Sequence, residues 1–255
     1  MSPFAQAVLA TLAVSALSLV GIVLAFRDWS QRIEIVSISF AAGVLLATTF
    51  LELLPEAIEG SRDGQVLAIT LAAIALFFGL ERLLHGLHGD HSEPPGTAHQ
   101  HHGHNHHVAS RYLILVGDSV HNFIDGVAIA AGFVADPALG ITTALAVAAH
   151  EIPHEIADYS ILVSSKLDRF TALALNFATA LTALLGVGAC FAFREFVELH
   201  IHDFMAATAG MFLYIAAAGL IPQIHHSPYR RSWLCTLPFF GGIGAMVAIG
   251  AIFPH

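Results

Sequence analysis

The residues best suited to chemistry lie in two short polar segments of an otherwise apolar chain. The first, within residues 117–126, holds two aspartates, a histidine and an asparagine: Asp118, His121, Asn122 and Asp125. The second, within residues 150–158, holds two histidines and three acids: His150, Glu151, His154, Glu155 and Asp158. Imidazoles and carboxylates are ligands for zinc and neighbouring divalent metals, and an asparagine adds a neutral oxygen. The two segments therefore predict a divalent-metal site.

Helical spacing would bring each set of side chains to one face. At about 100° per residue, the four side chains of the first segment fall within an arc of about 100°, with His121 and Asp125 one turn apart. In the second segment His150, His154 and Asp158 stack on successive turns, and the two glutamates lie beside them within about 140°. Two facing helices would then enclose one polar cluster.

The chain around these segments favours a lipid environment. Of its 255 residues 56% are hydrophobic and 11% are charged, against roughly 25% charged residues in an average soluble domain. Such a chain cannot cover its own surface with polar groups, which argues against a soluble enzyme. Its ten scattered Lys and Arg residues argue against nucleic-acid binding. Cys190 and Cys235 stand apart in apolar runs and indicate neither a disulfide framework nor a thiolate metal site.

Eight apolar runs are long enough, or nearly so, to cross a bilayer, which takes about 20 helical residues. They show no period-two alternation, so they favour helices over a membrane barrel. The first run has no basic segment before it and is interpreted as a retained helix rather than a signal peptide. We therefore predict an all-α membrane protein with a single domain, residues 1–255, and eight transmembrane helices. The runs are 4–26, 35–58, 66–88, 109–134, 138–165, 170–193, 203–224 and 233–253.

Positive charges predict the orientation of these helices. If both termini lie outside, the cytoplasmic connections carry eight Lys and Arg residues, and the outer connections carry Arg62 and Arg194. The eight are Arg27, Arg32, Arg82, Arg111, Lys166, Arg169, Arg230 and Arg231. We predict a multi-pass protein of the cell membrane (plasma or inner membrane) with both termini outside.

Two of the runs share a pattern. In the second run Pro55 follows Gly43 by twelve positions, and in the seventh run Pro222 follows Gly210 by twelve positions. An odd number of spans lies between the two runs, so they cross the membrane in opposite directions. Matching Gly/Pro-interrupted segments of opposite direction are typical of transporters. The pattern predicts an inverted 3+2+3 repeat, with spans four and five in the centre.

The polar segments fall inside spans four and five, where each charge costs on the order of 3 kcal/mol. Neither segment contains Lys or Arg, so its carboxylates would repel one another unless a cation neutralised them, and a divalent metal does so most simply. Pro153 has no N–H group, so the carbonyl of Ala149 loses its helical hydrogen-bond partner. A helix interrupted in this way is tolerated in a membrane only where it faces protein or a water-filled cavity.

A buried structural polar network is the alternative to a metal site. Asn176, on span six, is either a satisfied core amide or a further ligand.

Residues 85–107, between spans three and four, hold nine of the 17 histidines together with Pro94 and Pro95. This composition predicts a disordered cytoplasmic loop. Its neutral imidazoles would bind metal weakly, although these histidines could equally have no functional role.

On these residues the chain resembles the ZIP family of divalent-metal transporters. Residues 121–126, HNFIDG, resemble the fourth-helix signature of that family. Residues 150–155, HEIPHE, resemble the fifth-helix signature of its HExPHE subgroup, although Ala157 stands where the subgroup usually has glycine. The resemblance covers all eight runs and the histidine-rich loop. The chain also departs from residues that are common in the family at Glu52, Gly219 and Gln223. These differences bear on the entry and exit routes of the metal and on the metal preference.

The resemblance implies a two-metal or extended site between helices four and five. One ligand set would be His121, Asp125, His150 and His154, and the adjoining set would be Asn122, Glu151 and Asn176. It also implies a transporter rather than an enzyme, which carries zinc, or else iron or manganese, into the cytoplasm. Spans one, four, five and six would move against the rest. The family often forms homodimers.

Two competing functions follow from the residues. The string HEIPH at 150–154 is also the zinc-protease pattern H-E-x-x-H, which would make His150, Glu151 and His154 part of an intramembrane metalloprotease. Pro153 interrupts the regular helix that this pattern needs, and a conduit needs several adjacent sites so that ions can leave. A membrane metal sensor, in which no ion crosses, is the second alternative.

Overall fold

The computed structural model describes residues 1–25, 31–59, 64–87, 104–164 and 167–252. In these residues the regular structure is helical and contains no strand, which confirms the all-α prediction. Each predicted run coincides with a helix or with consecutive helices, and the short α9 (Arg194–Leu199) lies between runs six and seven. The others are α1 (Pro3–Ala25), α2 (Gln31–Thr48), η1 (Thr49–Leu53), α3 (Leu54–Glu59), α4 (Gln65–Leu87), α5 (His104–Ala135), α6 (Pro137–Ser164), α7 (Arg169–Ala180), α8 (Thr182–Ala192), α10 (Ile201–Tyr214), η2 (Ile215–Leu220), α11 (Ile221–His226) and α12 (Trp233–Ile252).

Five helical stretches of the described chain are long and apolar enough to cross a bilayer, and α1 adds a shorter apolar stretch, Pro3–Leu17. The helices α5 and α6 are also long, at 32 and 28 residues, but they carry the polar segments and are therefore less apolar. The protein is thus an integral multi-pass membrane protein, and the number of eight spans stays a prediction. The five stretches are Arg32–Glu59, Gln65–Leu83, Arg169–Ala192, Ile201–His226 and Trp233–Ile252.

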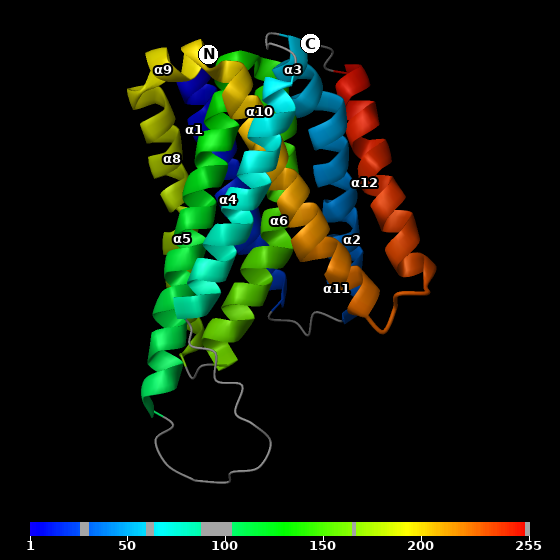
Figure 1. Ribbon diagram of the computed structural model, residues 1–255. Helices are drawn as coiled ribbons and strands as arrows, with labels where there is room; N and C mark the ends of the chain where they lie inside the picture. Colours follow the sequence, from blue (N-terminus) through cyan, green and yellow to red (C-terminus); the bar gives the residue numbers. More distant parts are fainter. Residues whose placement is uncertain (26–30, 60–63, 88–103, 165–166, 253–255) are drawn as a thin grey trace.

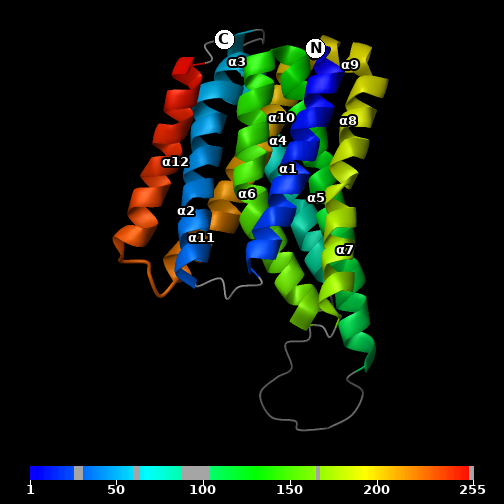
Figure 2. The ribbon, with the colours of Figure 1, turned by 180° about the vertical axis from the view of Figure 1, so that it is seen from behind.

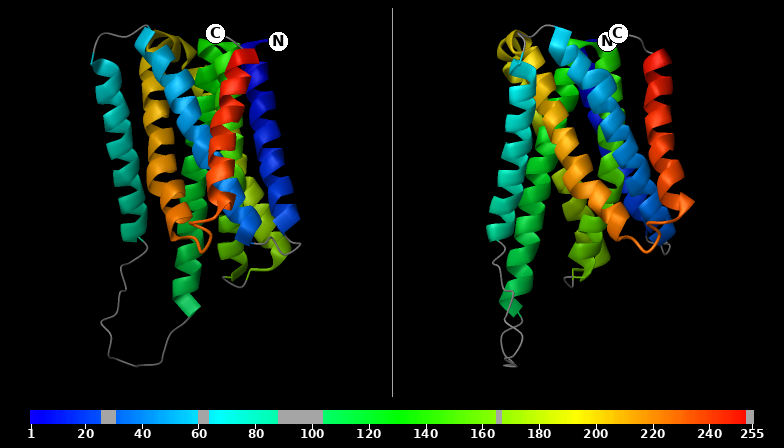
Figure 3. Two further views of the ribbon diagram at one scale, coloured as in Figure 1. Left: turned by 90° about the vertical axis from the view of Figure 1, so that its right-hand side faces the viewer. Right: turned by 45° about the vertical axis from the view of Figure 1, so that its right-hand side comes forward.

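The long helices run side by side, with α8 at one edge of the bundle and α12 at the other (Figures 1 and 2). Helix α12 packs along α2, α10 along α4, α1 along α6, and α8 along α5. In the right-hand view of Figure 3, α4 and α12 form opposite edges. Helix α6 contacts α1, α2, α5 and α7, so it occupies the middle of the bundle.

Two glycines bring α5 and α8 to backbone contact. A Cβ atom on Gly126 would lie 1.9 Å from the carbonyl oxygen of Ala183, and one on Gly186 would lie 2.0 Å from that of Phe123. Beside them, the hydroxyl of Thr182 donates a hydrogen bond to the carbonyl oxygen of Ser119 at 2.7 Å. We call this contact between α5 and α8 the seam. Because any side chain larger than that of glycine would force the two helices apart, the seam sets the position of α5 and hence of its polar residues.

The two matched runs contain the same irregularity. A π-helical turn precedes each proline: η1 ends before Leu54-Pro55, and η2 ends before Ile221-Pro222. In each case the residue before the proline donates its N–H five residues back, from Leu54 to Thr49 and from Ile221 to Ala216. Proline lacks a donor and collides with the preceding turn, and a widened turn accommodates both effects.

The matched glycines also have equivalent surroundings. A Cβ atom on Gly43 of α2 would lie 2.0 Å from the carbonyl oxygen of Phe239 on α12, and one on Gly210 of α10 would lie 2.4 Å from that of Thr70 on α4. The helical stretch that begins with α2 ends in α3 at the upper end of the bundle in Figure 1, whereas the stretch that begins with α10 ends in α11 at the lower end. The two stretches therefore run in opposite directions. These features agree with an inverted repeat, and the 3+2+3 repeat itself stays a prediction.

The predicted histidine-rich loop is helical at both ends. Residues 85–87 continue α4, and α5 already begins at His104. Residues 88–103 lie outside the described residues, as do Arg27, Arg62 and Lys166, on which part of the orientation prediction depends.

Candidate metal centre

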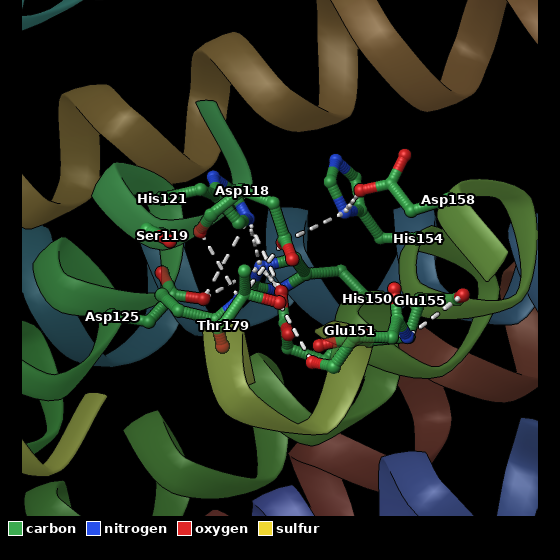
Figure 4. Close-up of polar contacts among 12 residues, drawn as sticks. Asp118, Ser119, His121, Asp125, His150, Glu151, His154, Glu155, Asp158 and Thr179 are labelled. Atoms are coloured by element: carbon green, nitrogen blue, oxygen red, sulfur yellow. Dashed lines mark hydrogen bonds and ion pairs between the residues drawn. The ribbon is translucent and has the colours of Figure 1, made fainter. Parts of the chain in front are cut away.

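Three neighbouring helices supply the predicted site residues. Helix α5 carries Asp118, His121, Asn122 and Asp125; α6 carries His150, Glu151, His154, Glu155 and Asp158; and α7 carries Asn176. Most of these residues are buried, at 4% exposure or less. His121 and Asp158 are partly buried, whereas the side chain of His154 is 43% exposed. Figure 4 shows the α5 and α6 residues as one continuous polar cluster, with Asp125 at one side and Asp158 at the other.

Four of these side chains converge on one point, and we call them the four-residue cluster: His121, Asp125, His150 and Glu151. One ligand atom from each lies within 4.8 Å of all the others. The Nε2 atom of His150 lies 3.2 Å from Asp125 Oδ2 and 3.6 Å from Glu151 Oε1. The Nε2 atom of His121 lies 3.2 Å from Glu151 Oε1, 3.7 Å from Asp125 Oδ2 and 3.3 Å from His150 Nε2.

A second group, which we call the Asp118 cluster, consists of Asp118, His154 and Asp158. The Nδ1 atom of His154 lies 3.5 Å from Asp158 Oδ2 and 3.9 Å from Asp118 Oδ1. The ring of His154 also stacks on the ring of His121, with centroids 4.8 Å apart and planes 17° from parallel. The two clusters are therefore adjacent.

The amides and the remaining glutamate connect the clusters to the surrounding helices. The Nδ2 atom of Asn122 donates to Asp118 Oδ1 at 2.9 Å. The Nδ2 atom of Asn176 donates to the Glu155 carboxylate and to the Glu155 carbonyl oxygen. Asn176 thus ties α7 to α6, while its own Oδ1 atom has no hydrogen-bond partner among the described residues. Both roles considered for Asn176, as core amide and as ligand, are compatible with this arrangement.

The grouping differs from the ligand sets that the family resemblance implies. Glu151, expected in the adjoining set, reaches His121 and lies in the four-residue cluster. His154, expected beside His150, instead lies with Asp158 and with Asp118, a residue of the first polar segment that is absent from the ligand sets implied by the resemblance. The signal for Asp118 was present in the sequence, because it lies one helical turn before Asn122 on the same face.

The electrostatics of the site favour a cation. In the described chain the ion-pair partners of Asp118, Asp125, Glu151 and Asp158 are the three histidines. Besides the oxygens that face histidines, three buried carboxylate oxygens of the site have no hydrogen-bond partner among the described residues: Asp118 Oδ2, Asp125 Oδ1 and Glu155 Oε1. Unsatisfied buried carboxylates are costly, and a divalent metal would compensate both the charge and the missing contacts.

A helical multi-pass membrane protein with a buried imidazole–carboxylate cluster is the class that the fold and site define. A sequence profile of the ZIP Zinc transporter family matches residues 4–112 and 97–250. The chain belongs to this family, whose members are transporters rather than enzymes.

Similar proteins agree with this assignment. Zinc transporter ZIP13 of Pongo abelii is 34% identical over 210 residues, covering 76% of this chain and 60% of its own length. ZIP13 of Mus musculus is 35% identical over 224 residues, covering 73% and 61%. Zinc transporter ZIP4 of Mus musculus is 40% identical over 126 residues, covering 49% and 19%. The matched part of the chain thus spans about 60% of the length of these ZIP13 relatives.

Proposed function

We propose that the protein carries a divalent metal across the membrane into the cytoplasm, with zinc as the expected substrate and iron or manganese as alternatives. The metal would pass through nine residues between α5, α6 and α7: His121, Asn122, Asp125, His150, Glu151, His154, Glu155, Asp158 and Asn176. The zinc transporters among the relatives support the choice of substrate.

The four-residue cluster is the observation that carries this proposal. Its two imidazoles and two carboxylates come from two facing helices, and their ligand atoms lie within 4.8 Å of one another. Zinc binds nitrogen and oxygen ligands at about 2.0–2.2 Å in a tetrahedral arrangement, so four atoms this close need only small side-chain movements to coordinate one ion. Asp125, His150 and Glu151 are 1–2% exposed, so the cost of burying them without a cation would be high.

The proposed path crosses a cell membrane, plasma or inner, with eight spans and with both termini outside. The length of α5 and α6 and the positive-inside distribution of Lys and Arg support this topology. The equivalent π turns and glycine contacts support an inverted repeat, which allows one set of helices to move against the other. We also propose that the protein can form a homodimer, as the family resemblance implies.

The geometry disfavours the protease alternative. In an H-E-x-x-H site both histidines bind one zinc ion, and the glutamate remains free to act as the general base. Here His150 Nε2 faces Asp125 and Glu151, whereas His154 Nδ1 faces Asp118 and Asp158. The two histidines therefore belong to different clusters, and Glu151 lies among the prospective ligands.

Zinc influx into liposomes tests the proposal. Purified protein is reconstituted into liposomes loaded with a zinc-sensitive dye, alongside empty liposomes and the variants His150→Ala and His154→Ala. We expect influx from the wild type and a strong decrease in both variants. Influx no faster than in empty liposomes would leave a metal sensor as the better account. Undiminished influx in both variants would remove the cluster from the path, and Glu151-dependent cleavage of a membrane peptide would favour the protease.

A further inference from the structure

The corner between α8 and α10 presents a surface that the metal centre does not use. Helix α9 lies there, between the apolar stretches Arg169–Ala192 and Ile201–His226, each of which is long enough to cross a bilayer. Figure 1 shows α9 at the upper end of the bundle, beside the end of α8. A segment that joins two membrane-crossing stretches at the end of a bundle lies at the surface of the bilayer, among the lipid head groups.

Large apolar side chains of this corner are uncovered. Phe193 is 69%, Phe196 is 57% and Leu199 is 79% exposed, whereas Val197 is buried and packs into the core. Val197 thus fixes α9 to the bundle, while the other three side chains face away from the core. Exposed apolar groups beside charged residues are typical of helices that lie in the membrane interface.

The same corner contains a surface cavity of about 430 Å³. Two of its aromatic walls are held by neighbouring rings. The ring of Phe191 packs edge-on against that of Phe4 on α1, with centroids 5.2 Å apart, and the ring of Phe196 lies 4.4 Å from that of His200. The cavity is therefore formed by ordered side chains. Its lining consists of Phe191, Ala192, Phe193, Arg194, Glu195 and Phe196.

Two opposite charges line this cavity, those of Arg194 and Glu195. The Nε–H of Arg194 donates to Glu198 Oε1 at 2.6 Å, one turn later, and this contact orients the guanidinium. A guanidinium carries five N–H donors, so its terminal nitrogens can bind a phosphate group in the paired geometry that arginine favours. The Glu195 carboxylate and the phenylalanine rings both attract an ammonium group. The cavity therefore suits a ligand that carries a phosphate and an ammonium together.

We propose that this cavity binds the head group of a phospholipid with a primary ammonium, of the phosphatidylethanolamine class. Arg194 binds the phosphate, Glu195 binds the ammonium, and the exposed phenylalanine rings contact the apolar part of the lipid. A primary ammonium donates hydrogen bonds to a carboxylate, which a quaternary ammonium cannot do, and a glycerol head group offers no cation. The site lies on α8 and α9, outside the proposed metal path, so it does not depend on metal transport.

Photolabelling in nanodiscs tests the head-group site. The full-length protein is placed in nanodiscs of unlabelled phosphatidylcholine that contain a small fraction of one photoactivatable phospholipid. Three such lipids are compared, which share the same photoreactive acyl chain and differ only in the head group: ethanolamine, choline or glycerol. Mass spectrometry of the digested protein measures the labelling of residues 191–199 and, at the other end of the same stretch, of the residues around Phe170.

We expect the ethanolamine lipid to label residues 191–199 several-fold more than the other two lipids. Glu195→Gln should remove this preference, because the variant has no charge for the ammonium. Arg194→Gln should lower the labelling by all three lipids, because each of them carries a phosphate. The matched control is Asp168→Asn, which removes the charge of an exposed carboxylate beside Arg169 and the exposed Phe170 and should keep the wild-type preference.

Equal labelling of residues 191–199 by the three lipids in the wild type would overturn the head-group site, as would a preference that survives in Glu195→Gln. Labelling by none of them would show that something else, such as a second copy of the chain, covers this corner, and would overturn the site as well. Both altered side chains are exposed, so the variants should fold. Unchanged labelling around Phe170 confirms this for each variant.

Discussion

At the residue scale, His150 has the most constrained geometry in the site. Its Nδ1 atom lies 3.1 Å from the carbonyl oxygen of Ala146, one turn earlier on α6. A hydrogen bond donated there leaves Nε2 with a free lone pair, directed at Asp125 and His121. The backbone of α6 thus selects the tautomer that a metal requires.

His150→Ala should therefore lower zinc affinity more than about tenfold, because losing even an outer hydrogen bond to a metal ligand costs about 10–100-fold. The matched control is His225→Ala, which removes an exposed imidazole at the end of α11. Isothermal titration with zinc measures both variants. Equal affinity in His150→Ala and the control would contradict the assignment of His150 as a ligand.

Protons should compete with the metal for the same imidazoles. A histidine binds metal only when its ring is neutral, and an ordinary histidine has a pKa of about 6.5. We expect zinc influx to slow as the pH falls below about 6, and to recover when the pH is restored. Dye-loaded liposomes measured across a series of pH values provide the test, and a flat rate from pH 5 to pH 8 would be incompatible with histidine ligands.

At the element scale, the seam between α5 and α8 positions the α5 half of the site. Gly126→Ala places a Cβ atom 1.9 Å from the Ala183 carbonyl oxygen, so the helices must separate. Forced overpacking costs about 1–3 kcal/mol. We expect a lower melting temperature and weaker zinc binding, because Asp125 is the neighbour of Gly126. Gly188→Ala is the control, since a Cβ atom there meets nothing within 4 Å; similar losses in both variants would argue against the seam.

The π turns at η1 and η2 are the element-scale feature that was least visible in the sequence. The shared Gly-to-Pro spacing predicted two matching helices, but a proline by itself is compatible with a kink, a break or a widened turn. The structure has the widened turn in both places. It also places Glu52 of η1 in a buried position, with Oε1 2.8 Å from where a Cβ atom on Gly250 of α12 would lie.

At the scale of the whole molecule, the predicted ligands lie on α5, α6 and α7 and not in the histidine-rich loop. Replacing residues 90–103 with a glycine–serine segment of equal length should therefore change the apparent zinc affinity or its regulation and leave influx intact. The equal length preserves the connection between α4 and α5. Influx into liposomes measures the result, and complete loss of influx in a well-folded variant would show that the loop belongs to the path.

The topology has its own test. Helix α1 begins, and α12 ends, at the same end of the bundle (Figure 1), so tags at the two termini should lie on one side of the membrane. The positive-inside distribution predicts that this side lies outside the cell. We expect antibodies to label both tags on intact cells, and a tag inserted at residue 95 only after permeabilisation. The reverse pattern would invert the proposed orientation.

The sequence by itself determined the helical class and predicted most of the residues of the candidate site. Eight apolar runs have few alternatives to helices in a bilayer, because backbone polar groups there must bond within their own segment. Acids and histidines without a nearby Lys or Arg are so costly at that depth that their positions alone indicated a metal site. These inferences depend on composition and on spacing along one helix.

Only the tertiary structure decided which residues meet. Spacing along a helix places His150, Glu151 and His154 on one arc, but the contacts of α5 with α6 and α8 decide that Glu151 reaches His121 and that His154 pairs with Asp118. Likewise, the hydrogen bond from Asn176 to Glu155 depends on how α7 packs against α6. The physical reason is that rotation and separation of neighbouring helices follow from close contacts between residues far apart in sequence, which no local pattern contains.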